Sequence, residues 1–176
     1  MSQLNFKAVD SVEFWRMVQP HFKRVFEHRR SRFPDPFYSD LEKERLKTLQ
    51  ANLDGRYSLH VLAYQSDQLV GWHVGEQEAA DTYYMRNSAV LEEYRGKSFY
   101  EQILGHVLNV VVAEGFQVIS SIHHPNNPAV LIPKLRKGFI ITATEMSDLF
   151  GFLVRMKYFA NEDRKKSFFE RIGLTF

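Results

Sequence analysis

The segment Arg95-Gly96-Lys97-Ser98 is the part of this sequence whose residue types and position best suit chemistry. It lies between a strand-like run and a long apolar helix pattern. A chain that turns here and then begins a helix leaves several backbone N–H groups without intrahelical partners. Together with the positive end of the helix dipole, these groups suit a phosphate or a diphosphate. The segment therefore favours a cofactor-using enzyme over a plain scaffold.

Two other interpretations concern the same residues. A P-loop is excluded, because the first glycine of its G-x-x-x-x-G-K-[ST] pattern would fall at Leu91. A capping box stays open, because Ser98 and Glu101 match its S-x-x-E pattern. The box and a phosphate site compete, since a Ser98 hydroxyl that accepts one helix amide leaves one fewer amide for phosphate.

Histidine and cysteine usage limits the other kinds of site. His123 and His124 follow a strand-like run and could meet a substrate or shuttle a proton, although paired loop histidines are commonly plain surface residues. No spacing completes a metal site with them, so we expect no metal. The chain has no cysteine, which excludes disulfides and a thiolate nucleophile.

The elements that would position these residues follow from periodicity and from helix-breaking residues. Three- and four-residue apolar spacing predicts helices, and alternation bounded by turn residues predicts strands. Helices are expected at 12–33, 41–53, 100–114, 128–137 and 161–172. Strands are expected at 58–64, 68–76, 82–90, 117–122, 139–144 and 150–158. This order predicts an α/β (α+β) fold with helices packed on a central sheet.

Length and composition indicate one folded domain. A chain of 176 residues with 44% hydrophobic residues can bury a sizeable core. A formal net charge of +2 gives no reason to expect a nucleic-acid partner. The N-terminal residues lack a signal-peptide pattern, and no apolar run approaches the roughly 20 residues of a membrane span. We therefore expect a cytoplasmic protein that does not bind a membrane.

Three short motifs give the sequence a family resemblance. Tyr94-Arg-Gly-Lys97 lies at the start of the central helix, and Asn127 is followed at a suitable distance by Gly138-Phe139. In this order the motifs resemble those of the GNAT family of N-acetyltransferases, over roughly 58–159. The resemblance implies a single domain, 1–176, with a mixed sheet whose two parallel strands splay apart. It also implies a helical acceptor-side part (1–57), a cofactor-binding core (58–159) and a C-terminal helix (160–176).

The resemblance also implies where acetyl-CoA would bind. It would lie between the strands expected at 82–90 and 117–122, with the thioester carbonyl polarised by a backbone N–H near Val90. Asn127 would bond near the pantetheine arm. The residues implied for the arm and the diphosphate are Ser88, Ala89, Val90, Arg95, Gly96, Lys97, Ser98, Phe99 and Tyr100.

The candidate general base is Glu76, at a strand end where the family often carries one. Period-two alternation places Val70, Trp72, Val74 and Glu76 on one face, so desolvation could raise the pKa of the carboxylate. The alternative is a polar strand end that faces water. Lesser candidates for the base are Glu78 and Asp81.

The sequence departs from the family pattern at the expected acetyl-CoA site. Ser98 and Tyr100 replace small residues, so the Tyr100 ring must point away for the site to stay open. Lys134 occupies the position of the tyrosine that often protonates the leaving thiolate. The general acid is therefore absent, or is replaced by Lys134 or water.

Three functions fit these observations. The first is an enzyme that transfers the acetyl group directly to a small-molecule or peptide amine. The second is a non-catalytic acyl-CoA-binding sensor on the same fold. The third is an interaction module that binds no nucleotide. An apolar tail would pack back on the sheet or form a homodimer, through Phe168, Phe169, Ile172, Leu174 and Phe176.

Overall fold

A seven-stranded mixed sheet forms the centre of the molecule. The computed structural model describes residues 3–26 and 39–174. The sheet has the order β1-β2-β3-β4-β5-β7-β6, in which only β4 and β5 pair in parallel. The strands are β1 Asn5–Ala8, β2 Ser58–Gln65, β3 Gln68–Ala79, β4 Thr82–Val90, β5 Val118–His123, β6 Ile140–Ser147 and β7 Gly151–Phe159. This arrangement confirms the predicted α/β fold with a mixed sheet.

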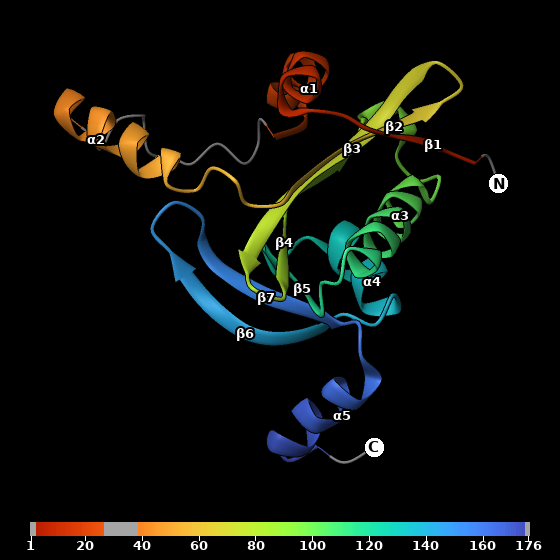
Figure 1. The fold of residues 1–176 in the computed structure, drawn as a ribbon. Helices are drawn as coiled ribbons and strands as arrows, with labels where there is room; N and C mark the ends of the chain where they lie inside the picture. The colour runs from red at the N-terminus through yellow and green to blue at the C-terminus, as the bar shows by residue number, and fades with distance from the viewer. Residues whose placement is uncertain (1–2, 27–38, 175–176) are drawn as a thin grey trace.

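Helices cover both faces of the sheet, with α1 on one side and α3 and α4 on the other (Figure 1). They are α1 Ser11–Phe26, α2 Asp40–Ala51, α3 Phe99–Ala113, α4 Pro128–Arg136 and α5 Glu162–Arg171, with a short 3-10 helix, η2 Glu92–Tyr94. β1 and η2 were not predicted from the sequence. The part of the predicted first helix beyond Phe26 lies outside the described residues. No described helix is both long and apolar enough to span a membrane.

Two apolar clusters hold these layers together. The inner face of α3 buries Ile103, Leu104 and Val107 against the sheet, as the helical spacing predicts. On the opposite face, α1 buries Phe14 and Val18 against residues of the central strands. Because both faces of the sheet are covered, the central strands are held at fixed positions. A cavity lined in part by β4 and α3 lies beside the first of these clusters.

The two parallel strands pair over a short distance only. Thr82 to Tyr84 pair with Val118 to Ser120, and beyond this point β4 keeps β3 as its only partner strand among the described residues. A β-bulge follows immediately: Val74 pairs with Asn87 and Glu76 with Tyr84, which leaves one extra residue in β4. Bulges bend a strand and increase its twist. The bulge therefore directs β4 away from β5 where the two strands separate.

The alternation predicted for β3 is wrong at its beginning. Val70 packs in the cluster beneath α3, whereas Trp72 and Val74 pack in the cluster beneath α1. The register of β2 and β3 explains this, because the partner of Ala63 is Gly71 and the partner of Tyr64 is Leu69. Val70 is the extra residue of this irregularity, so the side chains before it change faces.

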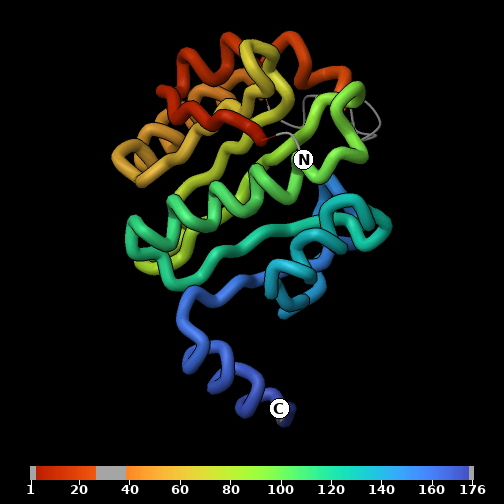
Figure 2. Tube along the Cα trace, turned by 90° about the vertical axis from the view of Figure 1, so that its right-hand side faces the viewer, coloured from red at the N-terminus to blue at the C-terminus, as the bar shows by residue number. Residues whose placement is uncertain are grey.

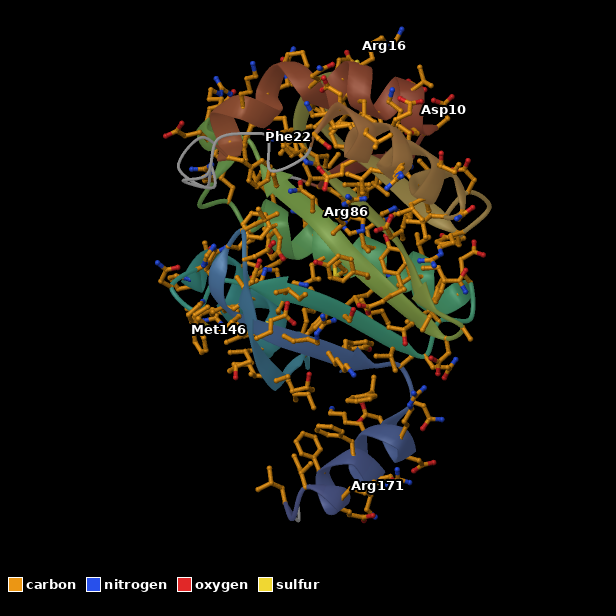
Figure 3. All side chains as sticks on the ribbon, turned by 90° about the vertical axis from the view of Figure 1, so that its left-hand side faces the viewer. Asp10, Arg16, Phe22, Arg86, Met146 and Arg171 are labelled. Atoms are coloured by element: carbon orange, nitrogen blue, oxygen red, sulfur yellow. The ribbon has the colours of Figure 1, made fainter. Side chains whose placement is uncertain are left out.

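The C-terminal helix α5 projects from the end of β7 (Figures 1 and 2). Phe168 packs back against Phe159 of β7, with ring centroids 5.4 Å apart. Ile172 and Leu174 are exposed. The view in Figure 3 shows α5 extending below the sheet and Met146 of β6 on the surface. The predicted packing of the apolar tail on the sheet is therefore found for Phe168. Phe176 lies outside the described residues.

Candidate active site

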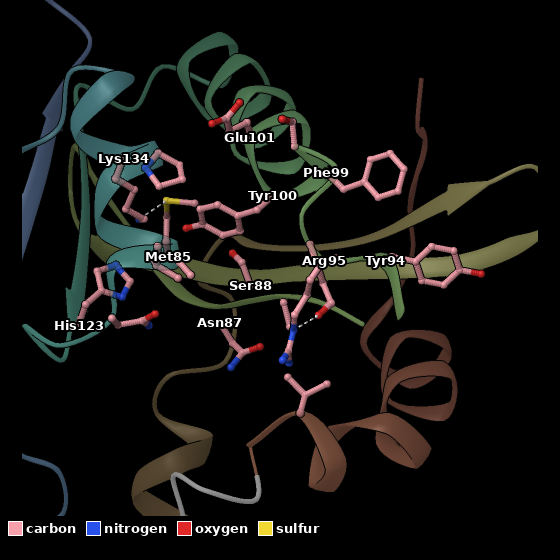
Figure 4. A pocket seen from close by; sticks show the side chains of 18 of the residues that line it. Met85, Asn87, Ser88, Tyr94, Arg95, Phe99, Tyr100, Glu101, His123 and Lys134 are labelled. Atoms are coloured by element: carbon pink, nitrogen blue, oxygen red, sulfur yellow. Dashed lines mark hydrogen bonds between the residues drawn. The ribbon is translucent and has the colours of Figure 1, made fainter. Parts of the chain in front are cut away.

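A cavity of about 560 Å³ opens where β4 leaves β5. Its walls come from the end of α1, from β4 at 85–90, from the turn and helix start at 94–101, from the end of β5 and from α4. The splay of the two parallel strands thus creates a site that is lined by helices from both faces of the sheet. Figure 4 shows side chains from β4, α3 and α4 converging in it.

The turn before α3 forms one wall of this cavity. Gly96 has φ +77° and Ser98 has φ +57°, and both line the cavity. A left-handed Ser98 does not have the extended backbone of a normal N-cap, and its side chain makes no capping hydrogen bond. The capping box of Ser98 and Glu101 is therefore absent, and that interpretation is wrong. The Ser98 side chain therefore does not compete with a ligand for the first backbone amides of α3.

A second unused donor lies at the start of α4. Asn127 is the N-cap residue of this helix, but its side chain makes no capping hydrogen bond. Its Nδ2 is buried without any hydrogen-bond partner, alone in this respect among the buried side-chain N and O atoms of the described residues. Buried donors are nearly always satisfied, so an orphan at a cavity wall indicates a ligand acceptor.

The Tyr100 ring lines the cavity, which contradicts the prediction that it points away. Figure 4 shows the ring directed toward Met85 and Lys134. Burial raises the pKa of the Tyr100 phenol well above its usual value, so the group stays protonated. The ring forms a wall beside Met85 and leaves the turn at Gly96 open, because the ring packs against the core beneath α3.

Lys134 points into the same region from α4. Its side chain is 1% exposed, and its Nζ donates to Ser121 Oγ at 2.8 Å and lies 3.2 Å from Met85 Sδ. The Nζ also lies 4.4 Å from the ring centroid of Phe139, and no ion pair with a carboxylate is found among the described residues. Burial lowers the pKa of Lys134 from 10.5 to about 7. This amine can therefore exchange a proton near neutral pH.

A short polar chain extends from Lys134 to the end of β5. Ser121 Oγ, which accepts from Lys134, lies 3.0 Å from His123 Nε2. His123 lines the cavity, as one of the interpretations of the sequence allowed, but His124 is not among the lining residues. The chain connects the buried amine to a histidine at the wall. It gives a path along which a proton can move.

A second polar chain, which the sequence analysis missed, extends from β4 into the core. Ser88 lines the cavity, and its Oγ lies 2.7 Å from His73 Nδ1. His73 Nε2 lies 2.7 Å from the hydroxyl of Tyr83. Burial lowers the pKa of His73 to about 3, so the ring is neutral at physiological pH. The available signal was a histidine inside an apolar strand run, which needs hydrogen-bond partners when buried.

The carboxylates proposed as bases do not enter the cavity. Glu76 is 44% exposed and pairs with Arg86 at 3.4 Å. Arg86 lines the cavity and lies on the side of the sheet seen in Figure 3. The shielded environment expected for a base at Glu76 is not found. Glu78 accepts from Ser120 at 2.5 Å and pairs with Arg155.

Asp81, the other lesser candidate, pairs with Arg164 at 2.6 Å. This bond ties the turn before β4 to α5. Most of the residues implied for the cofactor line the cavity, but Lys97 does not, and its Nζ lies 5.5 Å from the Tyr94 ring centroid. Among the described residues no group of three or more acidic or histidine side chains could hold a metal ion.

Several solved structures share this fold. An IAA acetyltransferase from Bacillus cereus has a TM-score of 0.64 and 13% identity, over 89% of this chain and 99% of that one. A spermidine N-acetyltransferase from Vibrio cholerae, in complex with CoA and spermine, has a TM-score of 0.64 and 16% identity, over 90% and 96%. A ribosomal-protein-S18-alanine N-acetyltransferase from Escherichia coli has a TM-score of 0.61 and 16% identity, over 88% and 92%. At these identities the likeness shows the fold.

The sequence itself settles the family. No protein with a curated description matches it significantly. The family model described as the acetyltransferase (GNAT) family matches residues 22–132, which is more than half of the chain. This range contains the splayed strand β4, the turn at Gly96 and the whole of α3. The chain therefore belongs to the acetyltransferase (GNAT) family and is an N-acetyltransferase.

Proposed function

We propose that the cavity binds acetyl-CoA and that the protein transfers the acetyl group directly to a small-molecule or peptide amine. The observation that carries this proposal is the convergence of unused donors on one cavity. The first amides of α3 and the Asn127 side chain all lack capping bonds there. Such donors fit the phosphate and amide oxygens of a CoA molecule.

The residues that would hold acetyl-CoA fall into two groups. The turn at 95–100, with its open amides and the left-handed Gly96, would bind the diphosphate. The backbone of Ser88, Ala89 and Val90 would bind the pantetheine arm, because β5 pairs with β4 only as far as Tyr84. Asn127 Nδ2 would donate to an oxygen of the same arm.

Lys134 is the proposed proton donor. Acetyl-CoA supplies an acetyl group activated as a thioester; the amine loses one proton and the sulfur gains one. The buried Lys134 Nζ holds a proton that it can release near pH 7, beside the Met85 and Tyr100 end of the cavity. The Ser121–His123 chain gives a route by which the proton is replaced. The sequence has no cysteine, so an acyl intermediate on a cysteine is excluded, which favours direct transfer.

The test begins with binding. Isothermal titration should detect acetyl-CoA and CoA, and thiol release should then be followed with a panel that includes spermidine, free amino acids and alanine-starting peptides. Lys134→Met should lower turnover by about a hundredfold or more without loss of CoA binding. Lys137→Met, on the same helix end, is the matched control. Absence of CoA binding at millimolar concentration would refute the proposal.

The alternative left open by the sequence is a non-catalytic acyl-CoA sensor, which would be a member of this family that has lost the transfer activity. It is favoured by Glu76, the expected base, which pairs with Arg86 and does not line the cavity. A sensor would bind CoA without amine-dependent thiol release from any member of the panel. The homodimer and the cytoplasmic location stay predictions from the sequence.

A further inference from the structure

Hydrogen bonds join Tyr83 to His73 and His73 to Ser88, and Ser88 lines the cavity. The surroundings of these side chains determine which group donates in each bond. Tyr83 and His73 are both 0% exposed. Among the described residues, His73 Nε2 is the only hydrogen-bond partner of the Tyr83 hydroxyl. A phenol that has one partner in a dry core donates its hydrogen to that partner, because an unmade buried hydrogen bond is costly. Tyr83 therefore donates to Nε2.

The protonation of His73 follows from this donation. A neutral imidazole carries one hydrogen, so a ring that accepts at Nε2 carries the hydrogen on Nδ1. Burial keeps His73 neutral, because it lowers the pKa of the ring to about 3. The Nδ1–H group then donates to Ser88 Oγ at 2.7 Å. The hydroxyl hydrogen of Ser88 is left to point elsewhere.

Ser88 lies where that hydrogen can meet a ligand. It lines the cavity, and Figure 4 shows its oxygen on the side of β4 that faces the Tyr100 ring. His73 is the cross-strand partner of Ser88 in β3 and β4, and its hydrogen bond holds the Ser88 oxygen in place. A donor held in this way needs no reorganisation when a carbonyl oxygen arrives, which makes it effective in a water-poor site.

We propose that the Ser88 hydroxyl is an oriented hydrogen-bond donor to the acyl carbonyl oxygen, and that Tyr83 and His73 are positioning residues that set its direction. The identity of the ligand rests on the proposed function, whereas the direction of the chain does not. Ser88 thus acts through its side chain as well as through the backbone groups that would bind the pantetheine arm.

The close packing of β3 supports a dedicated position for Tyr83. A side chain at Gly75 would overlap the Tyr83 hydroxyl. Glycine at this position is what allows the phenol to lie against β3 and reach His73. The next strand bulges within the same segment, between Tyr84 and Asn87, which places Tyr83 and Ser88 at opposite ends of the bulge.

The first experiment measures the His73 tautomer in the ligand-free protein. Long-range proton–nitrogen correlation spectra of nitrogen-labelled protein separate the Nδ1–H form from the Nε2–H form. We expect the Nδ1–H form for His73, and the Nε2–H form would overturn the proposal. Tyr83→Phe frees the ring to adopt either form, so both forms should appear. The control Tyr57→Phe removes a neighbouring phenol that makes no hydrogen bond with His73, and it should change nothing.

The second experiment measures the ligand carbonyl directly. Infrared spectra of acetyl-CoA, isotopically labelled at its carbonyl carbon, should show a lower stretching frequency on the wild-type protein than on Ser88→Ala. Ser88→Thr retains the hydroxyl and should restore the lower frequency. Equal frequencies on wild type and Ser88→Ala would refute the donor role. If acetyl-CoA does not bind at all, the proposed function fails, while the tautomer measurement still decides the direction of the chain.

Discussion

Two helices of this protein begin with the same S-x-x-E pattern, but only one of them is capped by it. At the start of α2, Ser39 has an extended backbone and accepts from the Glu42 amide at 3.3 Å, while Glu42 Oε2 accepts from the Ser39 amide at 2.7 Å. At the start of α3, Ser98 is left-handed and caps nothing. The same short motif therefore closes one helix end and leaves the other open.

The other helices divide in the same way. Asp10 accepts from the Glu13 amide before α1, and Asn161 accepts from the Arg164 amide before α5. Asn127 makes no such bond before α4. Of the α-helices in the described part of the chain, only α3 and α4 begin at the cavity. Helix ends that face solvent are satisfied by their own side chains, whereas those that face the cavity keep donors for a ligand.

The largest expected effect is on the free energy of unfolding, and it tests whether Lys134 is a buried charge without a carboxylate partner. Lys165 pairs with Glu162 at the surface, whereas Lys134 has no carboxylate partner among the described residues. Lys134→Met should raise the free energy of unfolding at pH 6 by about 2 kcal/mol or more, because it removes a buried charge. Lys165→Met, the control, should change it by less than about 0.5 kcal/mol.

The pH dependence of Lys134→Met has a definite sign. The pKa of Lys134 is about 7 in the folded protein and 10.5 as its unperturbed value. Below pH 7 both states are protonated, and the folded state bears the full cost of the buried charge. Between these pKa values the unfolded state binds more protons, so wild-type stability rises with pH. The advantage of the variant should therefore shrink toward pH 10; a constant difference in thermal melts would contradict the assignment.

The next effect concerns the turn before α3. Gly96 and Gly55 both have positive φ, +77° and +89°, and both have open space where a side chain would start. Valine strains the backbone equally at either position. Gly96→Val should lower CoA affinity by about tenfold or more, because the turn can no longer present its amides. Gly55→Val, which follows α2, should leave the titration unchanged. Equal CoA affinities of the two variants would contradict the assignment of the turn at Gly96 to the diphosphate.

The two asparagine caps should respond in opposite ways. Asn127→Ala removes a buried donor that has no partner, so stability should not fall, but CoA affinity should drop by about fivefold. Asn161→Ala should destabilise α5 by about 1 kcal/mol and leave CoA binding intact. Titration and denaturant unfolding of both variants check this. Loss of stability in Asn127→Ala would mean that its amide already has a structural role.

The smallest effect compares the two serines. Ser39→Ala should speed amide hydrogen exchange in the first turn of α2 by about fivefold, because a full capping box is lost. Ser98→Ala should leave exchange in the first turn of α3 unchanged, since Ser98 makes no capping bond. A similar acceleration at both helices would show that Ser98 caps α3 in solution.

Much of the architecture followed from local patterns. The strand at 82–90 has the predicted bounds, and the helix predicted at 100–114 is found at Phe99–Ala113. Glycines and prolines marked most element ends, because these residues restrict or free the backbone locally. The short strand β1 was missed, since its four residues are held by pairing with β2 rather than by an alternating pattern of their own.

The site was less predictable. Ser88, Gly96 and Asn127 line the cavity as the family resemblance implied, but Lys97 and Glu76 do not. Side-chain direction near a bulge depends on the partner strand, which a single sequence does not show. The same limit hid the chain from Tyr83 to Ser88, since His73 meets both residues across a strand pair.

The sequence by itself determined the order of helices and strands, the family, and the absence of a cysteine nucleophile, because these depend on residue types and on short-range periodicity. Only the tertiary structure decided which helix ends stay uncapped, that Tyr100 lines the cavity, and that Lys134 is buried with no carboxylate partner among the described residues. The physical reason is that capping, burial and pKa depend on what packs around a group, and these neighbours come from distant parts of the chain.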